Sequence, residues 1–405
     1  MNRVGDDERA SEQGRRHFSR RQALFLLGGS AAALAGCAPT GGGMTYQPIA
    51  PMQSTLPVPT GETIGTGNVR VGLLLPRTAQ GNAAALATAM RNAAELGLRD
   101  FVGADITILV KDSGGTGPVA AAAAQQAIAE GAEIILGPVF ADEVRQVAPI
   151  AGAAGVPVLS FSSDPGVAQP GIYIMGFLVD DQVRQLLAQA STGGLRSMAA
   201  LISTGAFGTL AEAALRQMAP RYGIRLVQVE QYSGQDLPQK VAAVAANAAQ
   251  IDGIFIPDDR AAAVVQQLVS AGVDTRRVRV LGSGTWNNPA VYANPALVGA
   301  WFPAPEISGF QTFTGRYRAA YGSEPQLTAT LAYDAVVLAA SLVKQAGTQR
   351  FQRSVLADPQ GFISGVNGLF RFNADGTNDR GLAIYEATGG APRLVQPAPR
   401  AFTGF

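Results

Sequence analysis

Two kinds of hydrophobic pattern alternate along most of this chain. Short apolar runs at 133–136 and 156–161 end at Gly137-Pro138 and at a Ser-Ser-Asp-Pro turn, which predicts buried β-strands. Between them, residues 140–152 carry apolar side chains every three or four positions, as expected for a helix with one buried face. Two apolar strands joined by a helix predict a parallel βαβ unit.

The same alternation runs through two halves of the chain. In the first half it predicts helices at 82–97, 117–130 and 140–152, and strands at 69–75, 105–110, 133–136 and 156–161. After residues 172–177 the plan repeats, with helices at 208–218, 237–249 and 260–271 and strands at 198–202, 224–229, 253–256 and 278–282. The pattern therefore predicts an α/β protein with two doubly wound lobes, each built on a parallel sheet.

A third region follows the two halves. Residues 299–305 are expected to be extended, and residues 309–321 and 328–345 have helical spacing. The apolar residues 370–372 then lead into Asn373-Ala374-Asp375-Gly376, a turn in which glycine tolerates a positive φ. We expect residues 382–385 to pair back on 370–372.

Residues 132–165 also carry a specific motif. In order, they contain Gly137-Pro138, Ala148-Pro149-Ile150-Ala151, Ala154-Gly155-Val156-Pro157 and Ser160. This pattern resembles the first lobe of the leucine/isoleucine/valine-binding protein family, which has the type I periplasmic-binding-protein fold. The resemblance runs from about residue 69 to about residue 394. It implies several chain crossings between the lobes, and hence a hinge that opens and closes around a ligand.

The resemblance and the length of 405 residues suggest four parts. We expect an export signal at 1–36 and a tether at 37–67. Residues 68–177 with 303–346 form the expected first lobe, and residues 178–302 with 347–405 form the expected second lobe.

Composition narrows the chemistry of the body. Residues 1–36 hold six of the 31 basic and four of the 30 acidic residues, so the remainder is nearly neutral, which argues against a nucleic-acid partner. The only histidine is His17 and the only cysteine is Cys37. The body therefore cannot use Ser-His-Asp or Cys-His catalysis, and it cannot form zinc sites of His and Cys. We expect no cofactor and no metal, although a carboxylate-only hydrolase or an oxygen-ligand metal site stays open.

The first 37 residues resemble a bacterial lipoprotein signal. Ser19-Arg20-Arg21-Gln22 resembles the twin-arginine motif, and the apolar residues 23–35 are too few to span a bilayer. Leu34-Ala35-Gly36-Cys37 resembles the lipobox, in which Cys37 receives the lipid; the alternative is a signal anchor with an incidental cysteine. Ala38, in place of an aspartate, favours sorting to the outer membrane. We expect a periplasmic protein held to the inner leaflet of that membrane by its lipid alone.

Residues 38–67 are rich in proline, glycine and threonine and show no strand or helix period. This composition predicts a flexible tether between the lipid and the body.

Polar residues at the expected carboxyl ends of strands are the candidate cleft residues, because ligands of such sheets bind there. They are Arg77, Thr78, Asp142, Ser162, Ser163, Asp164, Asp258, Asp259, Ser283 and Trp286. Simpler interpretations stay open for several of them. Arg77 can be a solvated loop residue, Asp258 or Asp259 can cap the next helix, and Trp286 can pack in a lobe contact instead of stacking on a ligand.

The resemblance implies how amino-acid-binding members hold a zwitterion. They use a hydroxyl after the Gly-Pro, a threonine-containing loop after the second strand, and an acid after the last second-lobe strand. This chain has Asp142, Asp164 and the segment Ser283-Gly284-Thr285-Trp286 at these places. An added carboxylate repels the substrate carboxylate, and losing the ammonium's partner costs about 1.5–3 kcal/mol. A free amino acid is therefore a poor fit, whereas an acidic mouth suits a cationic ligand, a divalent cation or a basic protein patch.

Three functions follow as hypotheses. The lipobox, the tether, the altered pocket and residues 368–376 resemble penicillin-binding protein activators, which implies a non-enzymatic lipoprotein that stimulates a peptidoglycan synthase (a penicillin-binding protein). The alternative is a receptor that delivers amino acids or related small molecules to an ABC importer. The third is a carboxylate-dependent hydrolase, which is supported only by the pairs of aspartates. The sequence favours the activator.

Overall fold

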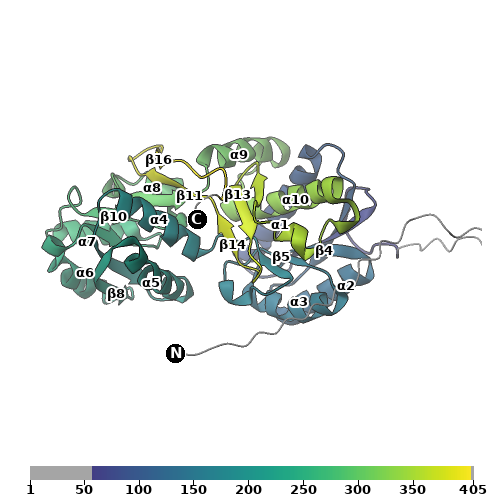
Figure 1. Ribbon diagram of the computed structural model, residues 1–405, viewed down its shortest axis with the longest axis horizontal. Helices are drawn as coiled ribbons and strands as arrows, with labels where there is room; N and C mark the ends of the chain where they lie inside the picture. Colours follow the sequence, from purple (N-terminus) through teal and green to yellow (C-terminus); the bar gives the residue numbers. More distant parts are fainter. Residues whose placement is uncertain (1–56, 403–405) are drawn as a thin grey trace, which may run out of the picture. The chain divides into compact units, whose positions relative to one another are not determined.

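The computed structural model describes residues 57–402, which contain two large sheets and one small sheet with helices packed on them (Figure 1). The predicted export signal, Cys37 and residues 38–56 of the predicted tether lie outside the described residues.

The first sheet has the strand order β1-β3-β2-β4-β5-β6 and is parallel except for β1. Figure 1 shows helices α2 and α3 on one face of this sheet and α1 and α10 on the other. Both faces are covered, which is why the strands are nearly continuous apolar runs. The elements are β1 (Thr63–Ile64), β2 (Val69–Leu75), α1 (Asn82–Asp100), β3 (Ile106–Asp112), α2 (Gly117–Ala129), β4 (Ala132–Leu136), α3 (Ala141–Ala154), β5 (Val158–Ser160), β6 (Ile172–Ile174) and α10 (Thr330–Ala346).

The second sheet has the order β16-β15-β11-β10-β9-β7-β8, with β15 and β16 antiparallel to their neighbours. Two hydrophobic clusters cover its faces, one with α4 and α5 and the other with α6 and α7. The elements are α4 (Val179–Thr192), β7 (Ser197–Ser203), α5 (Ala206–Met218), β8 (Arg225–Tyr232), α6 (Leu237–Ala245), β9 (Gly253–Phe255), α7 (Ala261–Ser270), β10 (Arg279–Leu281), α8 (Pro289–Tyr292), β11 (Trp301–Ala304), β15 (Ala383–Glu386) and β16 (Arg393–Gln396).

We call the two groups of elements the first lobe and the second lobe. The chain crosses between them three times: from β6 to α4, from β11 to α9 (Ile307–Tyr321), and from β14 (Asn378–Arg380) to β15. The two predicted doubly wound lobes are therefore present. Among the described α-helices, the sequence pattern missed α4 and two four-residue helices, at residues 289–292 and 353–356. The buried Val179, Val183, Leu186 and Ala190 of α4 have clear helical spacing.

The structure corrects the predicted lobe boundary after α10. We expected residues 347–405 in the second lobe, but α11 (Arg353–Leu356), β12 (Phe362–Ser364) and β13 (Gly368–Phe372) contribute side chains to the core of the first. The reason is the apolar alternation of β13, which places Phe372 with its ring centroid 5.2 Å from that of Tyr173 in β6. Of residues 347–402, only those after the third crossing belong to the second lobe.

The predicted end of the chain is also corrected. The turn at residues 373–376 is present, with Gly376 at φ +90°, but β13 pairs with β14 rather than with residues 382–385. Those residues cross to the second sheet, where β15 lies between β11 and β16. The turn predicts an antiparallel pair but does not identify the second strand of that pair. The partner of residues 382–385 depends on which sheet edge these residues reach in the folded protein.

The predicted tether is corrected at its carboxyl end. Thr63 and Ile64 form β1 on the edge of the first sheet, antiparallel to β3. Thr60 is also held, because Glu130 accepts hydrogen bonds from its backbone N–H (3.1 Å) and its hydroxyl (2.6 Å). The body therefore begins before residue 68. A short segment can pair with a sheet edge through its backbone alone, so it needs no hydrophobic pattern by which the sequence could reveal it.

One segment passes a test for a membrane span by length and hydropathy alone. This segment, residues 327–349, includes α10, and 67% of its most apolar stretch is buried inside the protein. In this structure α10 is a core helix that packs on α1.

Candidate functional site

A pocket of about 630 Å³ is lined by residues of both lobes. The walls come from the carboxyl ends of first-lobe strands, from loops of the second lobe and from α9 with the segment that follows it. This is where ligands of parallel sheets bind. The lining residues are Ser163, Phe177, Gln182, Phe207, Gly284, Thr285, Asn287, Asn288, Pro289, Pro303, Ala304, Pro305, Phe310, Thr314, Glu324, Pro325, Gln326, Leu327, Thr328 and Leu382.

The pocket wall is apolar and aromatic with neutral polar groups. Phe177, Phe207 and Phe310 supply aromatic surface. Among the described lining residues, Glu324 carries the single charge, and it is paired with the Arg318 guanidinium. The wall therefore favours a ligand with apolar surface and uncharged polar groups over a fully charged one.

Two lining residues have polar atoms that are buried and have no hydrogen-bond partner among the described residues. They are the amide nitrogen Nδ2 of Asn287 and the hydroxyl Oγ1 of Thr314. Both residues also line an adjoining pocket of about 340 Å³. A buried donor without a partner costs about 1–3 kcal/mol, so a ligand oxygen that reached either atom would gain a hydrogen bond that the protein does not itself provide.

The second-lobe wall is held by a loop after β10. The backbone N–H of Gly284 donates to Oε1 of Gln182 on α4 at 2.8 Å. The hydroxyl of Thr285 donates to the carbonyl of Pro257 at 2.9 Å, and Ser283 contacts the same carbonyl. The loop is thus tied to α4 and to the end of β9, which presents Gly284 and Thr285 to the pocket.

The first-lobe charges predicted for the cleft are paired elsewhere. Arg77 forms an ion pair with Glu62 (Nη1 to Oε2, 2.9 Å), and its side chain is 44% exposed. Asp164 forms an ion pair with Arg145 (Oδ2 to Nη2, 2.8 Å). Neither residue lines the pocket, so the acidic mouth proposed from the sequence does not include Asp164.

Of the other first-lobe candidates, only Ser163 reaches the pocket. Asp142 is exposed in the first turn of α3 and accepts a hydrogen bond from the backbone of Gly117 at 3.2 Å. Thr78 donates its backbone N–H to a carboxylate of the same lobe, and Ser162 is buried. The predicted loops are at the right edge of the sheet, but only Ser162 among these side chains is buried in the lobe. Thr78 and Asp142 are exposed and, like Arg77, lie outside the pocket lining.

The second-lobe aspartates have a structural role. Asp258 is 7% exposed and accepts hydrogen bonds from the Tyr232 hydroxyl (2.7 Å) and from the backbone N–H of Arg260 (3.0 Å). Burial and the contact with Asp258 raise the pKa of Tyr232. Asp258 therefore holds the backbone just before α7, whose N-cap residue is Arg260 and which has no side-chain cap, so the predicted cap by Asp258 or Asp259 is not formed. Asp259 is exposed and outside the pocket lining.

The interpretation of Trp286 as a stacking surface for a ligand is wrong. Its side chain is fully buried, its indole N–H donates to the carbonyl of Asp258 at 2.9 Å, and its ring packs against Phe302. Ser283 is buried beside it. Both residues support the loop that carries Gly284, and neither lines the pocket.

Sequence reasoning missed the residues that make up most of the pocket. Gln182 was missed because α4 was not predicted, although its spacing could have revealed it. Phe310 and Thr314 were missed because they come from a helix far from the predicted loops, whereas Asn287 was missed although it directly follows the candidate Trp286. The burial of Phe313 could have been predicted from the helical spacing of α9. The position of its neighbour Thr314 beside the pocket could not.

A buried charged cluster ties two of the three crossings together. The backbone N–H of Arg380 donates to Oδ2 of Asp181 on α4 at 2.8 Å, and its guanidinium donates to the carbonyl of Met175. The guanidinium lies between the rings of Phe177 and Phe370, at 4.8 and 5.2 Å from their centroids. Because Phe177 lines the pocket, this cluster also positions part of the pocket wall.

Asp334 of α10 faces the same cluster from the first lobe. Its Oδ2 accepts hydrogen bonds from Ser364 (2.8 Å) and Asn367 (2.6 Å), whereas Oδ1 has no partner among the described residues. Burial raises the pKa of Asp334 to about 6 and that of Asp181 to about 6, and burial lowers the pKa of Arg380 to about 10.

Substituting Asp334 with asparagine is expected to weaken the pH dependence of stability. A carboxyl whose pKa is raised in the folded state binds protons more readily when folded, so its contribution falls as pH rises from about 4 to about 6. Asp334 should make the free energy of unfolding about 1 kcal/mol larger at about pH 5 than at about pH 7.5. Urea unfolding at both pH values measures this. Asp334→Asn should reduce the difference and leave the part due to Asp181; an unchanged difference contradicts the assignment.

Within residues 57–402, no group of three or more His, Cys, Asp or Glu side chains is placed to hold a metal ion.

Comparison with known proteins agrees with this geometry. A family model described as periplasmic binding protein matches residues 68–391, so the chain belongs to the periplasmic binding protein family. Its α/β fold, with mixed sheets of mainly parallel strands, matches the type I members. No curated protein matches the sequence.

Several solved structures share the fold. A protein assigned as a branched-chain amino acid ABC transporter from Rhodospirillum rubrum is 23% identical, with a TM-score of 0.72, and the match covers 81% of this chain and 99% of that one. A substrate-binding protein from Desulfitobacterium hafniense in complex with Leu is 21% identical, with a TM-score of 0.62 and coverage of 81% and 99%. A solute-binding protein from Rhodopseudomonas palustris BisB5 in complex with 3,4-dihydroxybenzoic acid is 19% identical, with a TM-score of 0.60 and coverage of 82% and 97%.

Proposed function

We propose that this protein is a non-enzymatic periplasmic receptor that binds a small organic molecule for an ABC importer. The observation that carries the proposal is the pocket of about 630 Å³ with two unpartnered polar atoms, Asn287 Nδ2 and Thr314 Oγ1. Its size is within the range of small-molecule sites, and its polar groups converge on an apolar wall. The related structures with Leu and with 3,4-dihydroxybenzoic acid support the same class of function.

The ligand class follows from the wall. Three phenylalanines favour a ligand with a flat or branched apolar body, and the neutral Asn287 and Thr314 favour a carbonyl or hydroxyl group. A zwitterion would need its own carboxylate and ammonium partners, and the one charged lining residue, Glu324, is already paired with Arg318. We therefore expect an uncharged or weakly polar ligand rather than a free amino acid.

A second candidate is the penicillin-binding protein activator favoured by the sequence. It is supported by the same lack of a zwitterion partner among the described lining residues, since an adaptor has no need to hold a solute. The lipid on Cys37 and the outer-membrane location belong to this candidate and stay predictions. The two functions differ in whether a solute stabilises the folded protein.

The test is a thermal-shift screen with leucine, isoleucine, 3,4-dihydroxybenzoic acid, its amide and neutral phenols. A receptor should gain melting temperature with one class of solute, since a ligand that binds only the native state stabilises it by about 2.7 kcal/mol at 100 times its Kd. No shift with any solute, together with capture of a purified peptidoglycan synthase, would favour the activator instead.

Replacing Thr314 with valine should weaken binding of any solute found in that screen. The exchange keeps the shape but removes the hydroxyl, so affinity should fall by roughly tenfold if the ligand accepts its hydrogen bond. Titration calorimetry measures the change. Thr312→Val is the matched control, because Thr312 lies on the same helix, is exposed and already donates to the carbonyl of Ser308 at 2.9 Å. Equal affinities for the two variants would place the ligand elsewhere.

A further inference from the structure

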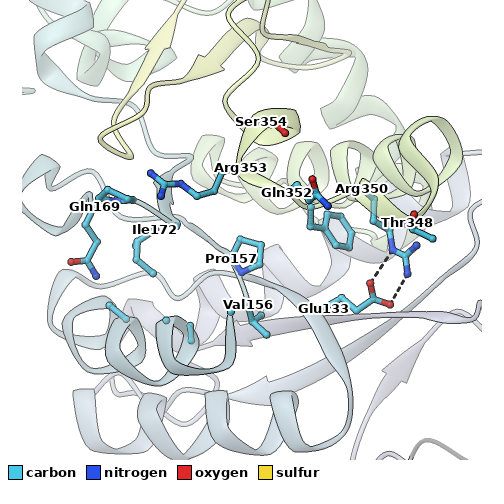
Figure 2. A pocket seen from close by; sticks show the side chains of 17 residues that line it. Glu133, Val156, Pro157, Gln169, Ile172, Thr348, Arg350, Gln352, Arg353 and Ser354 are labelled. Carbon is cyan, nitrogen blue, oxygen red and sulfur yellow. Dashed lines mark hydrogen bonds and ion pairs between the residues drawn. The ribbon is translucent and has the colours of Figure 1, made fainter. Parts of the chain in front are cut away.

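A second large groove lies at the opposite edge of the first sheet. Its volume is about 640 Å³. Glu133 near the start of β4, Pro157 before β5 and Ile172 at the start of β6 line it, whereas the pocket described above lies beyond the carboxyl ends of β5 and β6. The facing wall is the segment between α10 and α11 (Figure 2). The two cavities are therefore separate sites.

The floor of this groove is apolar and open. It includes Val156, Pro157, Ile172 and the ring of Phe351, and Figure 2 shows Pro157 and Ile172 facing the segment that carries Arg353. Val156 and Pro157 are half-buried and offer surface to an apolar ring or chain, whereas Ile172 and Phe351 are 2% and 8% exposed and contribute only a small part of the floor.

Gly152 lines the groove at a position where neither its backbone conformation nor its neighbours require a glycine. Gly152 lies within α3, where glycine costs about 1 kcal/mol relative to alanine. A Cβ placed on Gly152 would meet no atom within 4 Å, and its φ is not in the positive region. By contrast, Gly155 and Gly171 in the same groove have φ of +68° and +94° and are explained by their turns. Packing and backbone geometry leave Gly152 unexplained, whereas a ligand in the groove would need that space.

The charges of the groove leave one guanidinium available. Arg350 forms two hydrogen bonds with the Glu133 carboxylate, at 2.9 and 2.7 Å, so these two charges cancel. Arg353 is exposed and extends over Ile172 (Figure 2). Burial raises the pKa of the Tyr173 hydroxyl, and the nearby Arg353 guanidinium partly offsets this shift. With two arginines and one glutamate among the charged lining residues, the groove carries a net positive charge.

We propose that this groove is a second ligand site, which binds a small organic carboxylate with an apolar body. Arg353 binds the carboxylate by charge-assisted hydrogen bonds, and the surface of Val156, Pro157, Ile172 and Phe351 contacts the apolar part. The paired Arg350 and Glu133 close one end of the groove. The site does not depend on the pocket between the lobes or on which function that pocket serves.

The test uses 4-fluorobenzoate as the probe and follows its ¹⁹F signal during titration with the protein. The wild type should bind it, and 4-fluorobenzamide, which has the same shape and no charge, should bind at least tenfold more weakly. Arg353→Gln should weaken 4-fluorobenzoate by a similar factor. Gly152→Leu should abolish binding, because a Cβ at this lining position meets no atom within 4 Å and the longer side chain would occupy groove space.

Matched variants distinguish binding in this groove from binding elsewhere on the protein. Ala153→Leu adds a similar side chain at the next, exposed position of α3, outside the lining, and should bind the probe normally. Thr314→Val, in the other pocket, should also bind it normally. All variants should keep the wild-type melting temperature. The proposal is overturned if the wild type does not bind the probe, if Gly152→Leu and Arg353→Gln both bind it as the wild type does, or if Thr314→Val is the variant that loses it.

Discussion

Replacing Arg380 with methionine is expected to destabilise the protein by about 3–5 kcal/mol at neutral pH. Arg380 is 1% exposed, and its guanidinium is the buried positive charge that faces Asp181 and Asp334. Methionine has a similar length but removes the charge, the hydrogen bond to Met175 and the contacts with two aromatic rings. Asp334 then loses its counter-charge, which is the costly half of breaking a buried pair, whereas Asp181 keeps its ion pair with Arg184 at 2.5 Å.

The pH dependence of this variant distinguishes charge from packing. At about pH 5 the carboxyls of Asp181 and Asp334, with pKa values raised to about 6, are largely protonated, so the loss should be smaller than at about pH 7.5. Chemical unfolding at both pH values measures the two losses. Arg393→Met is the control: its side chain is 65% exposed and pairs with Glu386 at 2.8 Å, so it should cost at most about 1 kcal/mol. A loss at Arg380 that does not change with pH would show that packing, not charge, is what the residue contributes.

Replacing Gly282 with alanine is the second large effect that we expect. A Cβ at this position would lie 2.2–2.5 Å from three atoms of the Trp286 ring, and that ring is fully buried. The indole cannot move without losing its hydrogen bond to the carbonyl of Asp258 and its packing on Phe302. A single added methyl group should therefore cost about 3 kcal/mol, the upper part of the range for overpacked cores.

The same substitution should reach the pocket. Gly284 and Thr285 line it and immediately precede Trp286, so a displaced indole shifts that wall and lowers affinity for the solute. Thermal unfolding and calorimetric titration of Gly282→Ala measure the two effects. Gly234→Ala is the matched control, because its Cβ meets nothing within 4 Å and its φ is not positive; it should be neutral or stabilise by about 0.4–1 kcal/mol. Similar results for the two alanines would rule out a steric clash as the cause.

Much of the local structure could be predicted from the pattern of apolar residues. The strand predicted at residues 69–75 is β2 with the same bounds, and the helix predicted at 309–321 differs from α9 by two residues at its start. These elements follow from periods of two or 3.6 residues, which are properties of neighbouring positions. The glycine turn at 373–376 was predicted for the same local reason.

The candidate site was predicted only in part. The loops that follow β5 and β10 were expected at the cleft, and Ser163 and Gly284 do line the pocket. Which side chains point into it could not be predicted: Trp286 turned into the core, and Arg77 and Asp164 found ion-pair partners within the first lobe. A polar residue at a strand end can face a ligand, a neighbouring helix or an ion, and sequence alone does not rank these partners.

The sequence by itself determined the class of fold, the alternation of strands and helices and the lack of imidazole and thiol in the body. Only the tertiary structure decided that Asn287 of the second lobe and Thr314 of α9 line the same pocket, that Arg380 joins two chain crossings, and that residues 351–372 pack in the first lobe. The physical reason is the range of the interactions. The hydrophobic pattern of a helix or strand depends on residues two to four positions apart. A pocket or a buried charged cluster forms only where segments distant along the chain are packed together.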